Sequence, residues 1–185
     1  MTTTWVTSDS HFGHHNIIEY AGRPFDSADQ MDAYMVEQWN ERVKPQDHVY
    51  HLGDVTMARS SNQVEWFTKL IKSLHGHKRL ILGNHDHFPV KTYVNAGFEK
   101  IRGTGAWLGN GLLLSHFPVH PSSIGVRSIA CVHGHIHEKL SPPPVIRDTD
   151  GAKIPYINVS VEVTGYGPIS IDEVQARIRK ALSDR

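Results

Sequence analysis

The first half of the chain alternates short apolar, β-prone segments with longer segments whose apolar residues follow helical spacing. Strands are predicted in four of the short segments, at Trp5–Thr7, Val49–Leu52, Leu80–Leu82 and Phe98–Ile101. Helices are predicted in three of the longer segments, from Ser27 to Lys44, from Asn62 to Leu74 and from Val90 to Ala96. This alternation of strand and helix is typical of parallel βαβ units and predicts an α/β fold.

The first of these helices has clear ends and a clear apolar face. Asp26 and Ser27 both offer N-caps, and Pro45 prevents the helix from continuing. Met31, Met35 and Trp39 recur at helical spacing between these limits. This period favours a stripe of core residues over a set of ligands.

After residue 104 the pattern changes to consecutive strands. Asn110-Gly111 stands between two apolar runs, which is a strong hairpin signal, so an antiparallel portion begins there. Further strands are predicted at Ser128–Val132 and within 153–163, and a capping box at Ser170–Glu173 opens a last helix through Leu182. The sequence contains no internal repeat and no linker. Residues 1–185 are therefore expected to form one domain.

Residues that can bind metals or move protons follow five of the apolar segments. The densest group is Asn84-His85-Asp86-His87, after Leu82-Gly83. The other four segments are Asp9-Ser10-His11, Gly53-Asp54, Ser115-His116 and His133-Gly134-His135-Ile136-His137. A polar surface turn is the alternative for any one of them. Because parallel strands deliver their carboxyl ends to one edge of an open α/β sheet, five such segments together predict a functional site.

Histidine is the unusual feature of the composition, with 14 residues spread along the chain. Imidazole is the commonest metal ligand in proteins. The single cysteine, Cys131, lies in an apolar run, which excludes a disulfide framework and a thiolate zinc site. The candidate ligands are Asp9, His11, Asp54, Asn84, His116, His135 and His137. This is more than one ion needs, and two divalent ions bridged by a carboxylate and a water would use them all.

The charge balance restricts the range of partners. Lys and Arg number 19 and so do Asp and Glu, which leaves no formal net charge. A duplex-DNA binder would carry clustered cations, so strong duplex binding is not expected, although a small phosphate-bearing substrate is compatible. The N-terminal segment lacks a basic region followed by an apolar one, and no apolar run reaches the length of a membrane span. We expect a cytoplasmic protein that does not enter membranes.

The motif order D-x-H, G-D, G-N-H-D, H and G-H-x-H, from Asp9 to His137, resembles the calcineurin-like metallophosphoesterase superfamily, which includes small bacterial and phage phosphodiesterases. The resemblance implies a four-layer α/β/β/α sandwich with two mixed sheets and a dinuclear metal centre between them. It implies a metal-dependent phosphoric ester hydrolase in which a hydroxide that bridges the metals attacks phosphorus in line. Of the divalent metals that suit such a site, Mn²⁺ is expected first, with Fe, Zn, Ni or Co as alternatives.

The resemblance also implies roles for individual residues. Asp9, His11 and His137 would bind the first metal, Asn84, His116 and His135 would bind the second, and Asp54 would bridge the two. His85 resembles the non-ligand histidine that contacts the scissile phosphate and protonates the leaving oxygen. Met57 stands where the protein phosphatase branch has an Asp that orients this histidine, so Asp86 and His51 are the candidates for that role here.

Loop residues are candidates for contacting the substrate, with solvated loop positions as the alternative for each: His14, His15, Arg23, His120 and Arg127. Because the motifs use nearly the whole chain, we expect no cap domain and an open cleft. Few cations are available for a monoester dianion, which favours small or cyclic nucleotide-type diesters. A phosphomonoesterase and a non-enzymatic metal-binding scaffold for protein interaction, as in the retromer subunit of the superfamily, are the alternatives.

Overall fold

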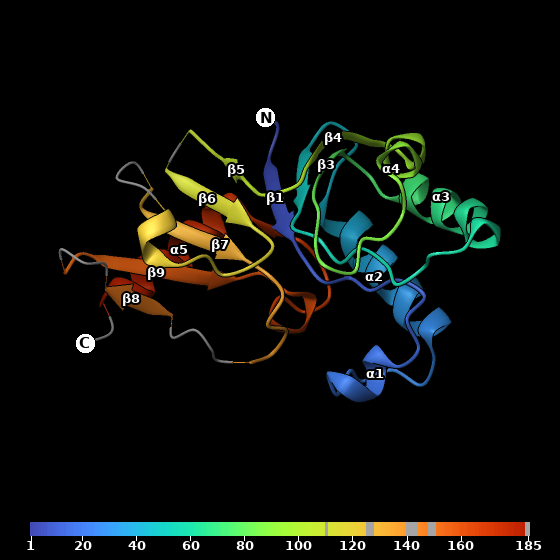
Figure 1. The fold of residues 1–185 in the computed structure, drawn as a ribbon, viewed down its shortest axis with the longest axis horizontal. Helices are drawn as coiled ribbons and strands as arrows, with labels where there is room; N and C mark the ends of the chain where they lie inside the picture. The colour runs from blue at the N-terminus through green and yellow to red at the C-terminus, as the bar shows by residue number, and fades with distance from the viewer. Residues whose placement is uncertain (110, 125–127, 140–143, 148–150, 184–185) are drawn as a thin grey trace.

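Two five-stranded sheets form the centre of the molecule (Figure 1). This computed structural model describes residues 1–109, 111–124, 128–139, 144–147 and 151–183. The first sheet has the order β10-β1-β2-β3-β4, with strands Ile169–Ser170, Thr4–Thr7, His48–His51, His77–Ile81 and Phe98–Arg102. The second sheet has the order β5-β6-β7-β9-β8, with strands Ala106–Trp107, Leu112–Ser115, Ala130–His133, Lys153–Asn158 and Val145–Arg147.

Both sheets combine parallel and antiparallel pairs. Strands β1 to β4 are parallel, and β10 joins the β1 edge antiparallel. In the second sheet β6, β7 and β9 are parallel, whereas β5 and β8 are antiparallel to their neighbours. The predicted α/β fold with two mixed sheets is confirmed.

Three helices cover the face of the first sheet that points away from the second sheet: α2 (Ala28–Arg42), α3 (Val64–Ser73) and α4 (Val90–Ala96) (Figure 1). Met31, Met35 and Trp39 of α2 are buried against this face, as their spacing predicts. The side chain of Ser27 caps α2 by accepting the backbone N–H of Gln30. No helix in the described part of the chain is long and apolar enough to cross a membrane.

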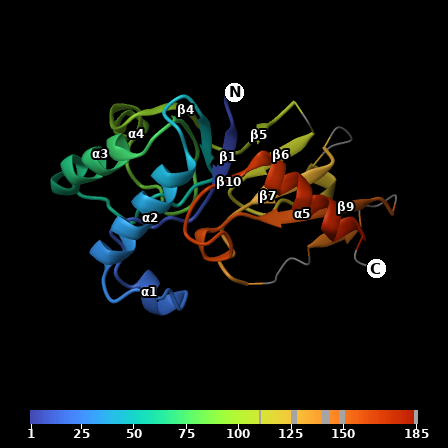
Figure 2. The ribbon, with the colours of Figure 1, turned by 180° about the vertical axis from the view of Figure 1, so that it is seen from behind.

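The opposite face of the first sheet packs against the second sheet. Val6 and Leu52 from the first sheet share one buried apolar cluster with Leu114 and Val132 from the second. Helix α5 (Ile171–Ser183) contributes Val174 and Ile178 to the same cluster. It therefore packs on the face of the second sheet that carries Leu114 and Val132 (Figure 2). The two sheets therefore pack directly against each other. This packing fixes the position of the loops of one sheet relative to those of the other.

The outer face of the second sheet carries a smaller apolar cluster. Cys131 and Tyr156 lie there under Ile124, close to the short 3₁₀ helix η2 (Pro121–Ser123). Cys131 is fully buried, which agrees with a small apolar role.

The structure adds short elements that the sequence pattern does not indicate. Helix α1 (Ile17–Tyr20) lies in a segment expected to be a loop. The start of the helix predicted from Asn62 is the 3₁₀ helix η1 (Ser61–Gln63), and α3 begins at Val64. The β-prone run after 153 ends as a strand at Asn158 and continues as the 3₁₀ helix η3 (Val161–Val163). Val161 donates its N–H to the carbonyl of Ser8, which follows β1. Asn110 of the predicted hairpin turn lies outside the described residues.

Candidate metal centre

The candidate ligands follow the carboxyl ends of parallel strands from both sheets. Asp9 follows β1, Asp54 follows β2, and His116 follows β6. The first two loops are joined by backbone hydrogen bonds, from Asp9 N–H to Gly53 O at 3.0 Å and from His11 N–H to Asp54 O at 3.0 Å. The ligand positions are therefore set by backbone contacts as well as by strand register.

Five of the candidate ligands have left-handed backbone conformations. The φ angles of Asp9, His11, Asp54, His135 and His137 lie between 50° and 71°, and Tyr166 is the sixth non-glycine residue with positive φ in the described ranges. Such a conformation costs about 1–3 kcal/mol per residue and persists only where the surroundings enforce it. Backbone strain of this kind is concentrated at functional sites. Here it is concentrated in the loops that carry the candidate ligands.

Two groups of three residues each bring ligand atoms within 4.8 Å of one another. The first group is Asp9, His11 and His137, and the second is Asp54, His116 and His135. Asn84 lies beside the second group, with its Oδ1 2.9 Å from Nε2 of His116. All seven candidate ligands are thus gathered at one place.

One carboxylate oxygen lies between the two groups. Oδ2 of Asp54 is 3.6 Å from Nε2 of His11 and 3.5 Å from Nε2 of His116. The other oxygen of Asp54 accepts the backbone N–H of His85 at 2.8 Å. Asp54 therefore faces both groups with a single atom.

The buried donor atoms fit divalent cations. Oδ1 of Asp9 and both ring nitrogens of His11 are buried without a hydrogen-bond partner among the described residues, although such atoms are normally paired. Burial raises the pKa of Asp9 and raises that of Asp54 to about 6, while it lowers the pKa of His11 well below its ordinary value. A cation would favour the ionised carboxylates and the neutral imidazole together, and mixed oxygen and nitrogen donors suit divalent metals.

The model of the calcineurin-like phosphoesterase family matches residues 2–177 of the chain. The chain belongs to this family. The resemblance in motif order is thereby confirmed, and the protein is a metal-dependent phosphoric ester hydrolase.

Relatives of this phosphoesterase match three quarters or more of its length. It is 34% identical over 181 residues to the uncharacterized protein MJ1445 of Methanocaldococcus jannaschii, across 97% of this chain and 93% of that protein. It is 31% identical over 166 residues to the gene 66 protein of Mycobacterium phage D29, across 76% of this chain and 81% of that protein. Among solved structures, the protein of unknown function AQ665 from Aquifex aeolicus is similar with a TM-score of 0.71 and 26% identity, across 95% of this chain and 99% of that one.

A buried ion pair supports the first ligand group of the phosphoesterase. Oε1 of Glu162 accepts a hydrogen bond from Nδ1 of His137 at 2.8 Å and from Nε and Nη2 of Arg23 at 2.9 and 2.6 Å. Arg23 also donates to the carbonyl oxygens of Asp9 and Ser10 at 2.7 and 2.8 Å. Glu162 and Arg23 thus join the loop after β1 to the imidazole of His137.

This arrangement corrects the expectation for Arg23. Its side chain has 0% exposed surface, and protein acceptors occupy its guanidinium group, so it does not line an open rim. The sequence pattern does not reveal the contact of Glu162 with the candidate ligand His137, because Glu162 lies within the β-prone run 153–163 and belongs to none of the family motifs. The only signal is an acidic residue in an otherwise apolar stretch.

A polar network also crosses from the first sheet to the second. Oδ2 of Asp9 accepts the backbone N–H of His135 and the hydroxyl of Ser160, both at 2.9 Å. The backbone N–H of Ser160 donates to Oδ1 of Asn158 at 3.0 Å, and the amide of Asn158 donates to the carbonyl of His137 at 2.6 Å. The two candidate ligands of the GHxH loop are therefore tied to the end of β1.

Neither residue suggested for orienting His85 contacts its ring. Asp86 accepts the backbone N–H groups of Asp54, Val55 and Gly83 at 2.8–3.0 Å, so it fixes the loops after β2 and β3. His51 is bonded to Ser10 and Gly53 instead. The imidazole of His85 is half-buried, 5.5 Å from that of His11 between ring centroids, and has no hydrogen-bond partner in the described part of the phosphoesterase. Its position is set by its backbone bond to Asp54.

The other predicted substrate contacts differ in their relation to the centre. His14 is half-buried, with its ring centroid 5.4 Å from that of His11. His15 is exposed, and His120 is exposed with its Nδ1 2.8 Å from the Ser122 hydroxyl. Arg127 lies outside the described residues. Only His14 is brought against a candidate ligand by a described contact.

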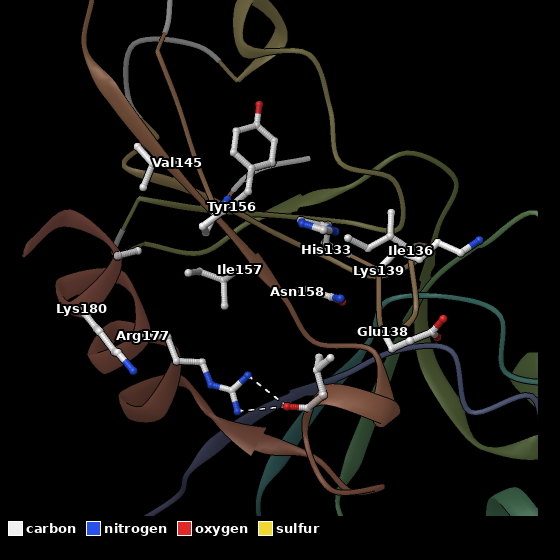
Figure 3. Close-up of a pocket in the computed structure, with 13 residues that line it drawn as sticks. His133, Ile136, Glu138, Lys139, Val145, Tyr156, Ile157, Asn158, Arg177 and Lys180 are labelled. Atoms are coloured by element: carbon white, nitrogen blue, oxygen red, sulfur yellow. Dashed lines mark hydrogen bonds between the residues drawn. The ribbon is translucent and has the colours of Figure 1, made fainter. Parts of the chain in front are cut away.

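A hollow of about 520 Å³ lies behind the GHxH loop of the phosphoesterase (Figure 3). Ile136 and Asn158 line it from the loop and from β9, and Arg177 and Lys180 line it from α5. None of the seven candidate ligands is among its lining residues. This hollow is therefore separate from the candidate metal centre.

The contact between Glu162 and His137 generates a prediction. Replacing a carboxylate that orients a metal-binding histidine typically lowers metal affinity about 10-fold to 100-fold. We expect Glu162→Gln to lower the affinity of the metal-free protein for Mn²⁺ by this factor. Calorimetric titration of protein from which a chelator has removed the metal measures this affinity. Glu65→Gln, which removes an exposed ion pair with Lys69, is the matched control.

Urea unfolding in the presence of chelator separates this effect from a loss of fold. The affinity change should persist under conditions where the Glu162→Gln protein is fully folded. Unchanged Mn²⁺ affinity in the folded variant would show that Glu162 has no part in the centre.

Proposed function

We propose that this phosphoesterase is a phosphodiesterase with two divalent metal ions, Mn²⁺ foremost, that hydrolyses small or cyclic nucleotide-type diesters. The observation that carries the proposal is the position of Asp54 Oδ2, 3.6 Å from His11 and 3.5 Å from His116. A carboxylate shared by two ligand groups is what a dinuclear centre requires.

The proposed ligand sets follow from the two groups. Asp9, His11 and His137 would hold one ion, Asn84, His116 and His135 would hold the other, and Asp54 would contact both. When bound, a pair of divalent ions lowers the pKa of a water molecule and neutralises phosphoryl oxygens. The chain contributes fixed positions, because strained loops, the ion pair of Arg23 with Glu162 and the Asp86 hydrogen bonds leave these side chains little freedom.

His85 is proposed as the general acid. Its backbone N–H is bound to Asp54, so its imidazole is held next to the ligand groups while remaining outside both of them. The ring is half-buried and has no competing hydrogen bond in the described ranges. An imidazole N–H in this position can donate its proton to the leaving oxygen as the ester bond breaks.

The preference for diesters rests on the scarcity of free cations at the centre. A monoester dianion calls for additional fixed positive charge near its third terminal oxygen. Arg23, one of two cations that could have supplied this charge, is buried and paired with Glu162. His14, and with it His15 and His120 at the rim, are proposed as neutral donors that suit a monoanionic diester better.

Hydrolysis of two model substrates tests the proposal. Metal is first removed from the protein with a chelator, and Mn²⁺ is then added back. Under these conditions kcat/KM should be higher for bis-p-nitrophenyl phosphate than for p-nitrophenyl phosphate. Equal values or a preference for the monoester would make the protein a phosphomonoesterase. No hydrolysis of either ester would favour the scaffold alternative.

The role of His85 gives a separate prediction. His85→Ala should bind two metal equivalents normally but turn over more slowly by about 100-fold to 10,000-fold, the usual contribution of general acid catalysis. His87→Ala is the matched control, since that side chain is exposed and lies 6.1 Å from the His85 ring. Elemental analysis of both variants checks the metal content, and a missing equivalent in His85→Ala would make His85 a ligand.

The bridging role of Asp54 predicts a difference between two variants. Asp54→Ala should weaken binding at both metal positions, whereas Asn84→Ala should mainly weaken one. Stoichiometric titration with Mn²⁺ distinguishes the two patterns. Two ions held with native affinity by Asp54→Ala would refute the bridge.

A further inference from the structure

Two exposed aromatic rings stand next to the candidate metal centre, one beside each ligand group. Phe117 is 45% exposed and Tyr20 is 70% exposed. Large apolar surfaces left open beside a polar site are often places where a ligand is bound. Neither residue is part of a family motif or of the ligand sets.

Phe117 contacts the second ligand group directly. Its ring centroid lies 4.7 Å from that of His116 and 4.5 Å from that of His135, at steep interplanar angles of 79° and 60°. These edge-type contacts hold the phenyl ring against two imidazoles, while almost half of the residue remains open. A flat group of a bound substrate could therefore stack on this ring without displacing a protein side chain.

Tyr20 is connected to the first ligand group through His14. It ends helix α1, and its ring centroid lies 6.3 Å from that of His14, which in turn lies 5.4 Å from that of His11 of the first group. Contacts thus run from Phe117 through His116 and Asp54 to His11. They continue from His11 through His14 to Tyr20. The two exposed rings are the end members of this series of contacts, and Asp54 lies between them in the series.

We propose that Phe117 and Tyr20 hold the two organic groups of a phosphodiester, and that these groups carry planar rings such as nucleobases. The inference rests on the proposed phosphodiesterase function and gives it a substrate class. A phosphate placed beside Asp54 has one ester group directed toward each ring. Stacking of a base on an aromatic side chain contributes about 1–3 kcal/mol and tolerates any base, because every base has a flat face.

Two inhibitors of equal charge test the inference. Diphenyl phosphate carries two rings and dimethyl phosphate carries none, and both compete with bis-p-nitrophenyl phosphate as monoanionic diesters. Phe117→Ala and Tyr20→Ala are each expected to raise the inhibition constant of diphenyl phosphate by about tenfold, which corresponds to about 1.4 kcal/mol. The inhibition constant of dimethyl phosphate should not change.

Conservative and distant variants complete the design. Phe117→Trp and Tyr20→Phe keep a ring and should retain native inhibition by diphenyl phosphate. Trp107→Ala removes an indole that is 63% exposed on β5 and should have no effect.

The possible failures are distinguishable. If the wild-type protein does not hydrolyse bis-p-nitrophenyl phosphate, the proposed function itself is wrong. If hydrolysis proceeds and either alanine variant binds diphenyl phosphate normally, the two-sided inference is wrong. Equal weakening of diphenyl and dimethyl phosphate would also overturn it, because that result would mean a disturbed metal centre instead of a lost stacking contact.

Discussion

The carboxylate of Asp9 connects the two sheets at the place where the chemistry is proposed. It accepts hydrogen bonds from His135 and Ser160, both supplied by loops of the second sheet, although Asp9 itself follows the first strand of the first sheet. These bonds engage one oxygen and leave the other buried without a partner in the described structure. The apolar contact between the sheets brings the loops near each other, and this carboxylate sets their register.

The strained backbone of the ligands has a related cause. Side chains that converge on one point from several strands must leave their strands at sharp angles, and a left-handed residue produces such a turn in a single step. Glycine would adopt this conformation easily, but it has no side chain to offer as a ligand. Asp9, Asp54 and His137 therefore adopt this unfavourable conformation. The packed sheets stabilise it, together with the backbone N–H bond that Asp86 accepts and the bond that Arg23 donates to a backbone carbonyl.

Much of this could be predicted from the sequence, because the strands are apolar and the reactive residues follow them directly. Helix α4 has the predicted bounds, and the core stripe of α2 is buried as expected. The contribution of Glu162 could not be predicted, since its partners Arg23 and His137 are 139 and 25 residues away. Strand β10 could not be predicted for the same reason. Its two residues form a strand only because they pair with the distant β1.

Position along the chain also determines when the centre can exist during synthesis. Asp9 and His11 are synthesised well before Ser160 and Glu162, which hold this ligand group, and β10 comes after them. Domains complete their folding once their sequence has emerged. The nascent chain therefore carries an open β1 edge and unsupported ligands until residues 160–170 have emerged, and the complete metal centre can form only after that point.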